Sequence, residues 1–153
     1  DRNGSCIWRT ERIHTANQIT AIEGTAADEE KDSLEVCLDA ILSYEGVARN
    51  TGYLLEQGKS VAEVLQENLQ DVLVLDLTGC SLESVLYYPD REIPVLVLSE
   101  DGSAVLITGF DEHNILLMDP AAGRVSRMGR GDAAAWFEEN GNRFVSYVKM
   151  PEQ

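Results

Sequence analysis

The chain has 153 residues and a mass of 16.9 kDa, which is the size of one ordinary domain. Its composition, 44% apolar and 25% charged with four prolines and twelve glycines, is typical of a globular protein and excludes a disordered or fibrous one. Twelve basic against twenty-seven acidic residues give a net charge of −15, a field that repels phosphate backbones and anionic lipid headgroups. We therefore expect neither nucleic-acid binding nor direct membrane binding by this domain.

Residues for metal, cofactor or disulfide chemistry are scarce. No apolar run reaches the length of a membrane span, and the sequence shows no signal peptide. Three cysteines (Cys6, Cys37 and Cys80) are too few for a disulfide scaffold, and no Cys-x-x-Cys or Cys/His spacing indicates zinc. The acidic tracts lack a calcium-loop pattern, and the glycines show no phosphate-binding spacing. We expect no metal and no cofactor.

Residues 1–31 are expected to form an N-terminal arm with short strands at 6–8 and 19–22, followed by an acidic surface linker that begins at residue 25. A second segment, 32–153, is expected to form the folded domain. It opens with Asp32 as a helix N-cap, and Glu35 completes a capping box. The helix spans 33–45, and Gly46 ends it.

The remaining elements indicate helices first and a sheet afterwards. Helices are expected at 51–57, at 60–69 behind a Ser60–Glu63 capping box, at 81–88 capped by Ser81, and at 132–139 capped by Asp132. Strands are expected at 72–75, 94–99, 104–110, 115–119, 125–128 and 144–149. Because short turns join the three central strands, the sheet is predicted to be antiparallel and the fold class α+β.

Three motifs in this order resemble the papain-like fold and, within it, the bacteriocin-processing peptidases that cleave double-glycine leaders. They are SLEVCLDAILSYEGV, IPVLVL and AVLITGFDEHNILLMDPAAG. The resemblance spans residues 32–149, most of the chain. It implies helices at the N-terminal side packed on a C-terminal antiparallel sheet, with a groove between the two halves.

The resemblance also locates the catalytic positions of the family. The family cysteine starts the first helix thirteen residues before its final glycine, and that position is Ser33 here. The family histidine opens the strand that continues as VLITGFD, and that position is Ser103. The aspartate of the DP pair is kept as Asp119. The oxyanion-hole glutamine, six residues ahead of the nucleophile, is replaced at Ala27 and Asp28.

These replacements remove the chemistry of a cysteine peptidase. A thiolate is made available by an adjacent imidazole and a helix N-terminus, whereas a serine hydroxyl needs a general base within hydrogen-bond reach. Ser103 cannot be that base, and Asp119 ordinarily orients an imidazole that is missing here. We therefore predict a degenerate peptidase, with Ser33, Ser103 and Asp119 facing one another across the groove, the two serines within about 10 Å.

Two alternatives stay open. One is an active cysteine hydrolase with a rearranged site that uses Cys37 or Cys80 as nucleophile and His113 as base. Cys37 is on the apolar helix face and is expected to be a core residue, Cys80 is in a turn before a helix, and His113 follows two acids in a surface turn. The other is a purely structural module with an occluded groove.

The leading hypothesis is a catalytically inactive papain-like domain that binds a peptide or protein partner or scaffolds a cell-envelope assembly. Degenerate domains of the family are attached to transporters and hold export substrates, which is what the resemblance implies about partners. The chain begins at Asp1 rather than Met and has thirty-two residues ahead of Ser33. We therefore expect a bacterial, extracytoplasmic or membrane-anchored protein, with a cytoplasmic location as the alternative.

Overall fold

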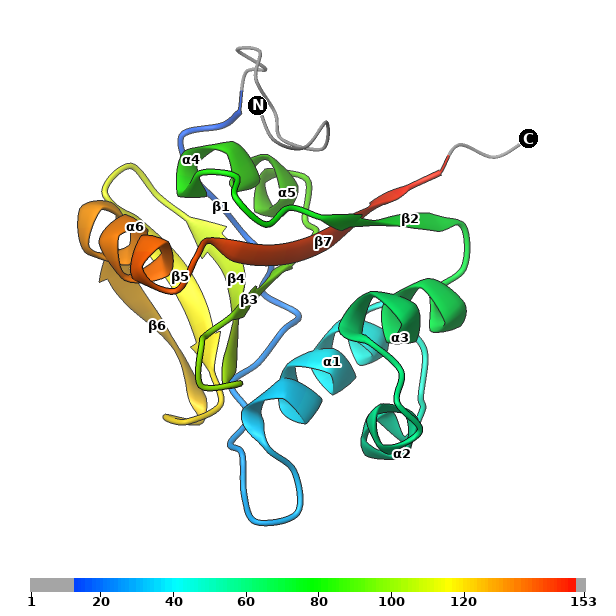
Figure 1. Ribbon diagram of the computed structural model, residues 1–153. Helices are drawn as coiled ribbons and strands as arrows, with labels where there is room; N and C mark the ends of the chain where they lie inside the picture. The colour runs from blue at the N-terminus through cyan, green and yellow to red at the C-terminus, as the bar shows by residue number, and fades with distance from the viewer. Residues whose placement is uncertain (1–12, 151–153) are drawn as a thin grey trace.

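A seven-stranded antiparallel sheet forms the centre of the computed structural model, which describes residues 13–150 (Figure 1). Its strands lie in the order β2-β7-β3-β4-β5-β6, and β1 pairs with β4. Their bounds are β1 Asn17–Gln18, β2 Val72–Asp76, β3 Val95–Leu98, β4 Ala104–Phe110, β5 Asn114–Asp119, β6 Arg124–Gly129 and β7 Arg143–Lys149.

Six helices accompany the sheet in the described part of the chain. They are α1 Ser33–Tyr44, α2 Thr51–Glu56, α3 Val61–Asn68, α4 Leu82–Val85, α5 Tyr87–Asp90 and α6 Arg130–Glu139. Short polar side chains cap several of them: Asp32 accepts from the Glu35 N–H at the start of α1, and Ser60 and Glu63 form a full capping box on α3. The capping box expected at α1 is only half formed, because the Glu35 carboxylate lies against Gly52 of α2 and does not accept from the Asp32 N–H.

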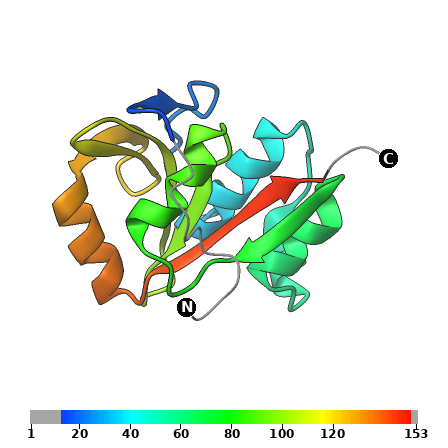
Figure 2. The ribbon, with the colours of Figure 1, turned by 90° about the horizontal axis from the view of Figure 1, so that it is seen from above.

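The helices cover opposite sides of the strands. Helices α1, α2 and α3 gather on one side, whereas α6 lies against β5 and β6 on the other (Figures 1 and 2). All seven residues of β4 are buried, because helices and neighbouring strands enclose this central strand. The α+β class and the antiparallel sheet expected from the order of elements are confirmed.

The described part of the N-terminal arm joins this core. Strand β1 pairs with the end of β4, where Asn17 opposes Phe110 and Gln18 opposes Gly109. A Cβ on Gly109 would stand 2.7 Å from the Asn17 carbonyl oxygen, so glycine permits this close approach. His14 anchors the arm, because its backbone N–H and its ring Nδ1 contact the buried Asp90 carboxylate at 3.0 and 2.7 Å.

Three further local expectations were wrong. Helix α6 begins at Arg130 with Gly129 as N-cap and no side-chain cap, because the Arg130 N–H bonds to the His113 carbonyl oxygen as β6 runs into the helix; Asp132 is therefore inside the first turn. The helix expected at 81–88 is two one-turn helices, α4 and α5, that meet at Leu86. Only Asn17–Gln18 is a strand in the described part of the arm, and 20–22 form a turn. The strand expected at 6–8 lies outside the described residues.

Candidate functional site

Ser33, which the resemblance predicts to occupy the position of the family cysteine, is the first residue of α1. Its side-chain Oγ accepts a hydrogen bond of 3.0 Å from the backbone N–H of Ala104, the first residue of β4. A helix N-terminus favours negative charge, and this N–H adds a donor aimed at the same atom. Both features would stabilise negative charge on a side chain at position 33, but the side chain there is a neutral hydroxyl.

Ser103 immediately precedes Ala104, and standard bond lengths therefore bring the Ser33 and Ser103 hydroxyls within roughly 8 Å of each other. The Ser103 hydroxyl donates to the Asp101 carboxylate at 2.6 Å, and the Ser103 backbone N–H donates to the same oxygen at 2.9 Å. The hydroxyl bond first, and then the backbone bond, hold the pKa of Asp101 below its usual range. Ser103 is consequently part of a tight turn and offers no base to Ser33.

Asp119 ends β5 at the same end of the sheet. Leu106 pairs with Met118 and Ile107 with Leu117, so the same register brings Val105 opposite Asp119. Ser103 and Asp119 therefore share one face of neighbouring strands. The Asp119 carboxylate accepts from the Ala121 N–H at 3.0 Å, which makes it a turn residue as well.

The loop before α1, where the resemblance predicts the position of the family glutamine, contains no side-chain amide at residues 27–32. The Ala27 N–H donates to the Pro120 carbonyl oxygen at 2.9 Å, which ties this loop to the β5–β6 turn. The Asp28 carboxylate accepts from the N–H groups of Glu30 and Lys31 at 2.8 and 2.9 Å. These backbone bonds lower the pKa of Asp28 and shape the entry into α1.

Cys37 lies one turn beyond Ser33 and is completely buried, with 0% exposure. Burial raises the pKa of its thiol far above the ordinary value, and the nearby Asp119 and Asp32 carboxylates raise it further. A neutral, enclosed thiol is a small hydrophobic core residue and a poor nucleophile.

The two histidines of the sequence are both described, and neither is near Ser33. His113 is exposed in the β4–β5 turn, which the length of β4, roughly 20 Å, separates from Ser103. His14 is bound to Asp90 beside the same far end of β4, where β1 pairs. The structure therefore does not bring His113 together with Cys37.

Cys80 is buried in the turn before α4 and is disulfide-bonded. A cysteine in a disulfide has no thiolate to act as a nucleophile. Cys6 lies outside the described residues.

Two solved structures share this architecture. A C39-like peptidase from Bacillus anthracis superposes with a TM-score of 0.71 at 14% sequence identity, covering 89% of this chain and 99% of that chain. The peptidase domain of Streptococcus ComA, a bifunctional ABC transporter of a quorum-sensing pathway, superposes with a TM-score of 0.55 at 14% identity, covering 86% and 99%. The fold is that of the C39 peptidases. No family model and no curated protein matches the sequence.

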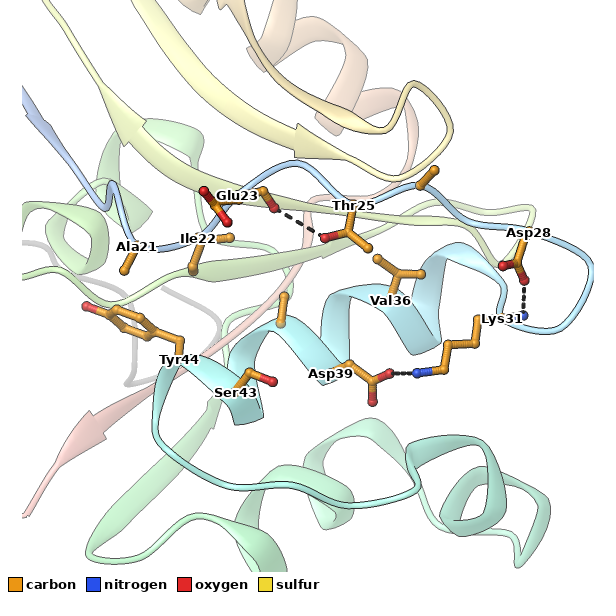
Figure 3. Close-up of a pocket in the computed structure, with 12 residues that line it drawn as sticks. Ala21, Ile22, Glu23, Thr25, Asp28, Lys31, Val36, Asp39, Ser43 and Tyr44 are labelled. Carbon is orange, nitrogen blue, oxygen red and sulfur yellow. Dashed lines mark hydrogen bonds and ion pairs between the residues drawn. The ribbon is translucent and has the colours of Figure 1, made fainter.

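In this C39 fold, a groove of about 680 Å³ runs along α1 (Figure 3). One wall is the face of α1 that carries Val36, Ala40 and Ser43. The other wall is formed by the segment 21–26, which we call the strap and of which all residues but Gly24 line the groove. The strap lies close to the β5–β6 turn. A Cβ on Gly24 would stand 2.4 Å from the Cα atom of Arg124, so only glycine fits at this position. Four ionisable side chains also line the groove: Glu23, Asp28, Lys31 and Asp39.

Sequence reasoning did not find this groove. Its one signal is the spacing of Val36, Ala40 and Ser43, which are small side chains on one stripe of α1 beside its apolar stripe. The sequence of the strap shows no helix or strand periodicity. Its path depends on contacts with the β5–β6 turn, which is distant in the sequence, and local patterns therefore could not predict it.

Helices long and apolar enough to cross a membrane do not occur between residues 13 and 150.

Proposed function

We propose that the chain is a degenerate relative of the C39 peptidases, a catalytically inactive domain that binds a peptide or protein partner or scaffolds a cell-envelope assembly. The observation that carries the proposal is the juxtaposition of Ser33, Ser103 and Asp119 at the start of α1 and β4. The hydroxyl of Ser33 lies at a helix N-terminus and accepts the Ala104 N–H, but a hydroxyl needs a neighbouring base to act as a nucleophile, and no imidazole lies beside it in the described part of the chain.

The surroundings of the alternative nucleophiles support an inactive domain. The Cys37 thiol is enclosed and its pKa is raised, Cys80 is in a disulfide, and His113 is at the other end of β4. A thiol without a neighbouring base stays protonated near neutral pH, and an active cysteine hydrolase is therefore the weaker hypothesis. The open groove beside α1 favours a binding domain over a purely structural one.

An extracytoplasmic location in a bacterial envelope is part of the proposal. Disulfides form and persist in oxidising compartments, so the disulfide-bonded Cys80 supports it. The net charge of −15 argues against a lipid or nucleic-acid surface as the partner.

Incubation with a synthetic double-glycine leader peptide tests the function directly. We expect isothermal titration calorimetry or fluorescence anisotropy to register binding, and mass spectrometry of the mixture to recover the peptide intact. Ser33→Ala is the matched control, and we expect it to leave the peptide equally intact because the hydroxyl performs no chemistry. Cleavage by the native chain that Ser33→Ala or Cys37→Ser abolishes would overturn the inactive assignment.

A further inference from the structure

The groove beside α1 has the dimensions of a short extended peptide. From Val36 to Ser43 the helix rises roughly 10 Å, which matches about three residues of extended chain. The wall formed by α1 carries small side chains, and Tyr44 closes one end of the groove (Figure 3). A peptide lying along α1 would have the strap as its other neighbour.

The strap presents main-chain groups that have no partner in the described part of the chain. Residues 23–26 are all exposed, and of their backbone groups only the Glu23 carbonyl oxygen accepts a bond, from the Thr25 hydroxyl at 3.5 Å. An extended segment with free N–H and C=O groups pairs readily with the main chain of an incoming peptide. The strap can therefore offer backbone hydrogen bonds to a peptide without losing bonds of its own.

Charge determines which peptide fits. The lining carries the three carboxylates of Glu23, Asp28 and Asp39 against the single ammonium of Lys31. Lys31 contacts Asp39 at 2.5 Å, and Asp39 also accepts from Thr51 at 2.6 Å, so this pair is satisfied within the protein. Glu23 and Asp28 remain exposed to the groove, within a chain whose net charge is already −15.

We infer that the groove between the strap and α1 binds an extended cationic peptide, whose main chain pairs with residues 23–26 and whose basic side chains approach Glu23 and Asp28. The inference deepens the proposed function and rests on it. It names the partner chemistry and places the peptide on the flank of α1.

Fluorescence anisotropy with labelled hexapeptides tests the inference. The probes are a peptide of alternating lysine and alanine, its glutamate–alanine counterpart, and the lysine peptide with alternate amides N-methylated. The lysine peptide can form attractive pairs with the two carboxylates of Glu23 and Asp28, whereas the glutamate peptide is repelled by both. We therefore expect the lysine peptide to bind about tenfold or more tightly than the glutamate peptide at low salt. We expect N-methylation to weaken its binding and added salt to narrow the charge preference.

Two variants assign the binding to this groove. Ala40→Trp places a large side chain on the α1 wall and fills part of the groove. Ala135→Trp, at an exposed position of α6, is its matched control. We expect Ala40→Trp to weaken the lysine peptide about tenfold or more and Ala135→Trp to leave it unchanged. The double variant Glu23→Gln with Asp28→Asn removes the two exposed charges, while the amide oxygen introduced at position 28 can still accept the backbone bonds. It therefore tests the groove even if Ala40→Trp perturbs folding.

The outcomes separate this inference from the proposed function. Two outcomes contradict binding of a cationic peptide in this groove: an affinity that does not depend on peptide charge, and an affinity that is unchanged in both groove variants. Either outcome leaves the proposal of an inactive partner-binding domain standing. The same holds if the leader peptide binds and the lysine peptide does not. Cleavage of either probe contradicts the proposed function itself.

Discussion

Replacing Ser33 by Cys together with Ser103 by His is expected to lower the pKa of the introduced thiol below its ordinary value of about 8.5. The two positions are within roughly 8 Å, so an imidazolium at 103 can face a thiolate at the start of α1. The helix N-terminus and the Ala104 N–H also favour the anion. The nearby Asp32 and Asp119 carboxylates oppose it, as they do at Cys37.

The single variant Ser33→Cys separates these effects. It keeps the helix terminus and the Ala104 donor but lacks the cation, and an opposite charge at close range typically lowers a pKa by about one to three pH units. We therefore expect the double variant to reach half-maximal iodoacetamide alkylation at least about one pH unit below the single variant.

Ser43→Cys, at an exposed position in the last turn of α1, is the matched control, and its thiol pKa should lie at or above the ordinary value because the C-terminal end of a helix disfavours an anion. Full peptidase activity is not expected, because removing one oxyanion donor costs on the order of a hundredfold in rate. Identical alkylation profiles for the single and double variants would show that residues 33 and 103 do not face each other.

Reduction of the Cys80 disulfide is expected to destabilise the fold by about 2–4 kcal/mol, because the cross-link restricts the unfolded chain. In a domain of this size that loss corresponds to a fall in Tm of roughly 5–15 °C. Thermal unfolding followed by circular dichroism, with and without a thiol-free reductant such as a phosphine, measures it.

Cys80→Ser is the control: it should unfold at the lower temperature and be insensitive to the reductant. The denatured, unreduced protein should also show fewer than the three thiols that its cysteines would give if all were free. A count of three, or a Tm unaffected by reduction, contradicts a structural disulfide at Cys80.

Much of the fold could be predicted because local chemistry and tertiary structure agree. Ser60 and Glu63 form their capping box, and the turns around Asp101 and Asp111 make the hairpins that the sequence indicates. The prediction that Asp132 caps α6 was wrong because α6 follows β6 without a break. The backbone bond from Arg130 to the His113 carbonyl oxygen takes the place of a side-chain cap. Such a long-range contact leaves no trace in local sequence.

The candidate site divides in the same way. The expectation that Ser33, Ser103 and Asp119 lie together comes from the resemblance to the papain-like peptidases and not from any local pattern of the sequence. The groove and the Cys80 disulfide could not be predicted, because one depends on the path of an irregular strap and the other on three cysteines at unrelated spacings. The contact of His14 with the buried carboxylate of Asp90 joins residues 76 positions apart and had no sequence signal.

The most direct test of an inactive site is the intact mass of the native chain after exposure to a thiol-directed electrophile at neutral pH. Because Cys37 is enclosed with a raised pKa and Cys80 is in a disulfide, we expect no adduct at either residue. Denaturant should then expose Cys37 and give one adduct at that residue. Fast, stoichiometric labelling of Cys37 or Cys80 in the native protein would reveal an activated thiol and contradict the account.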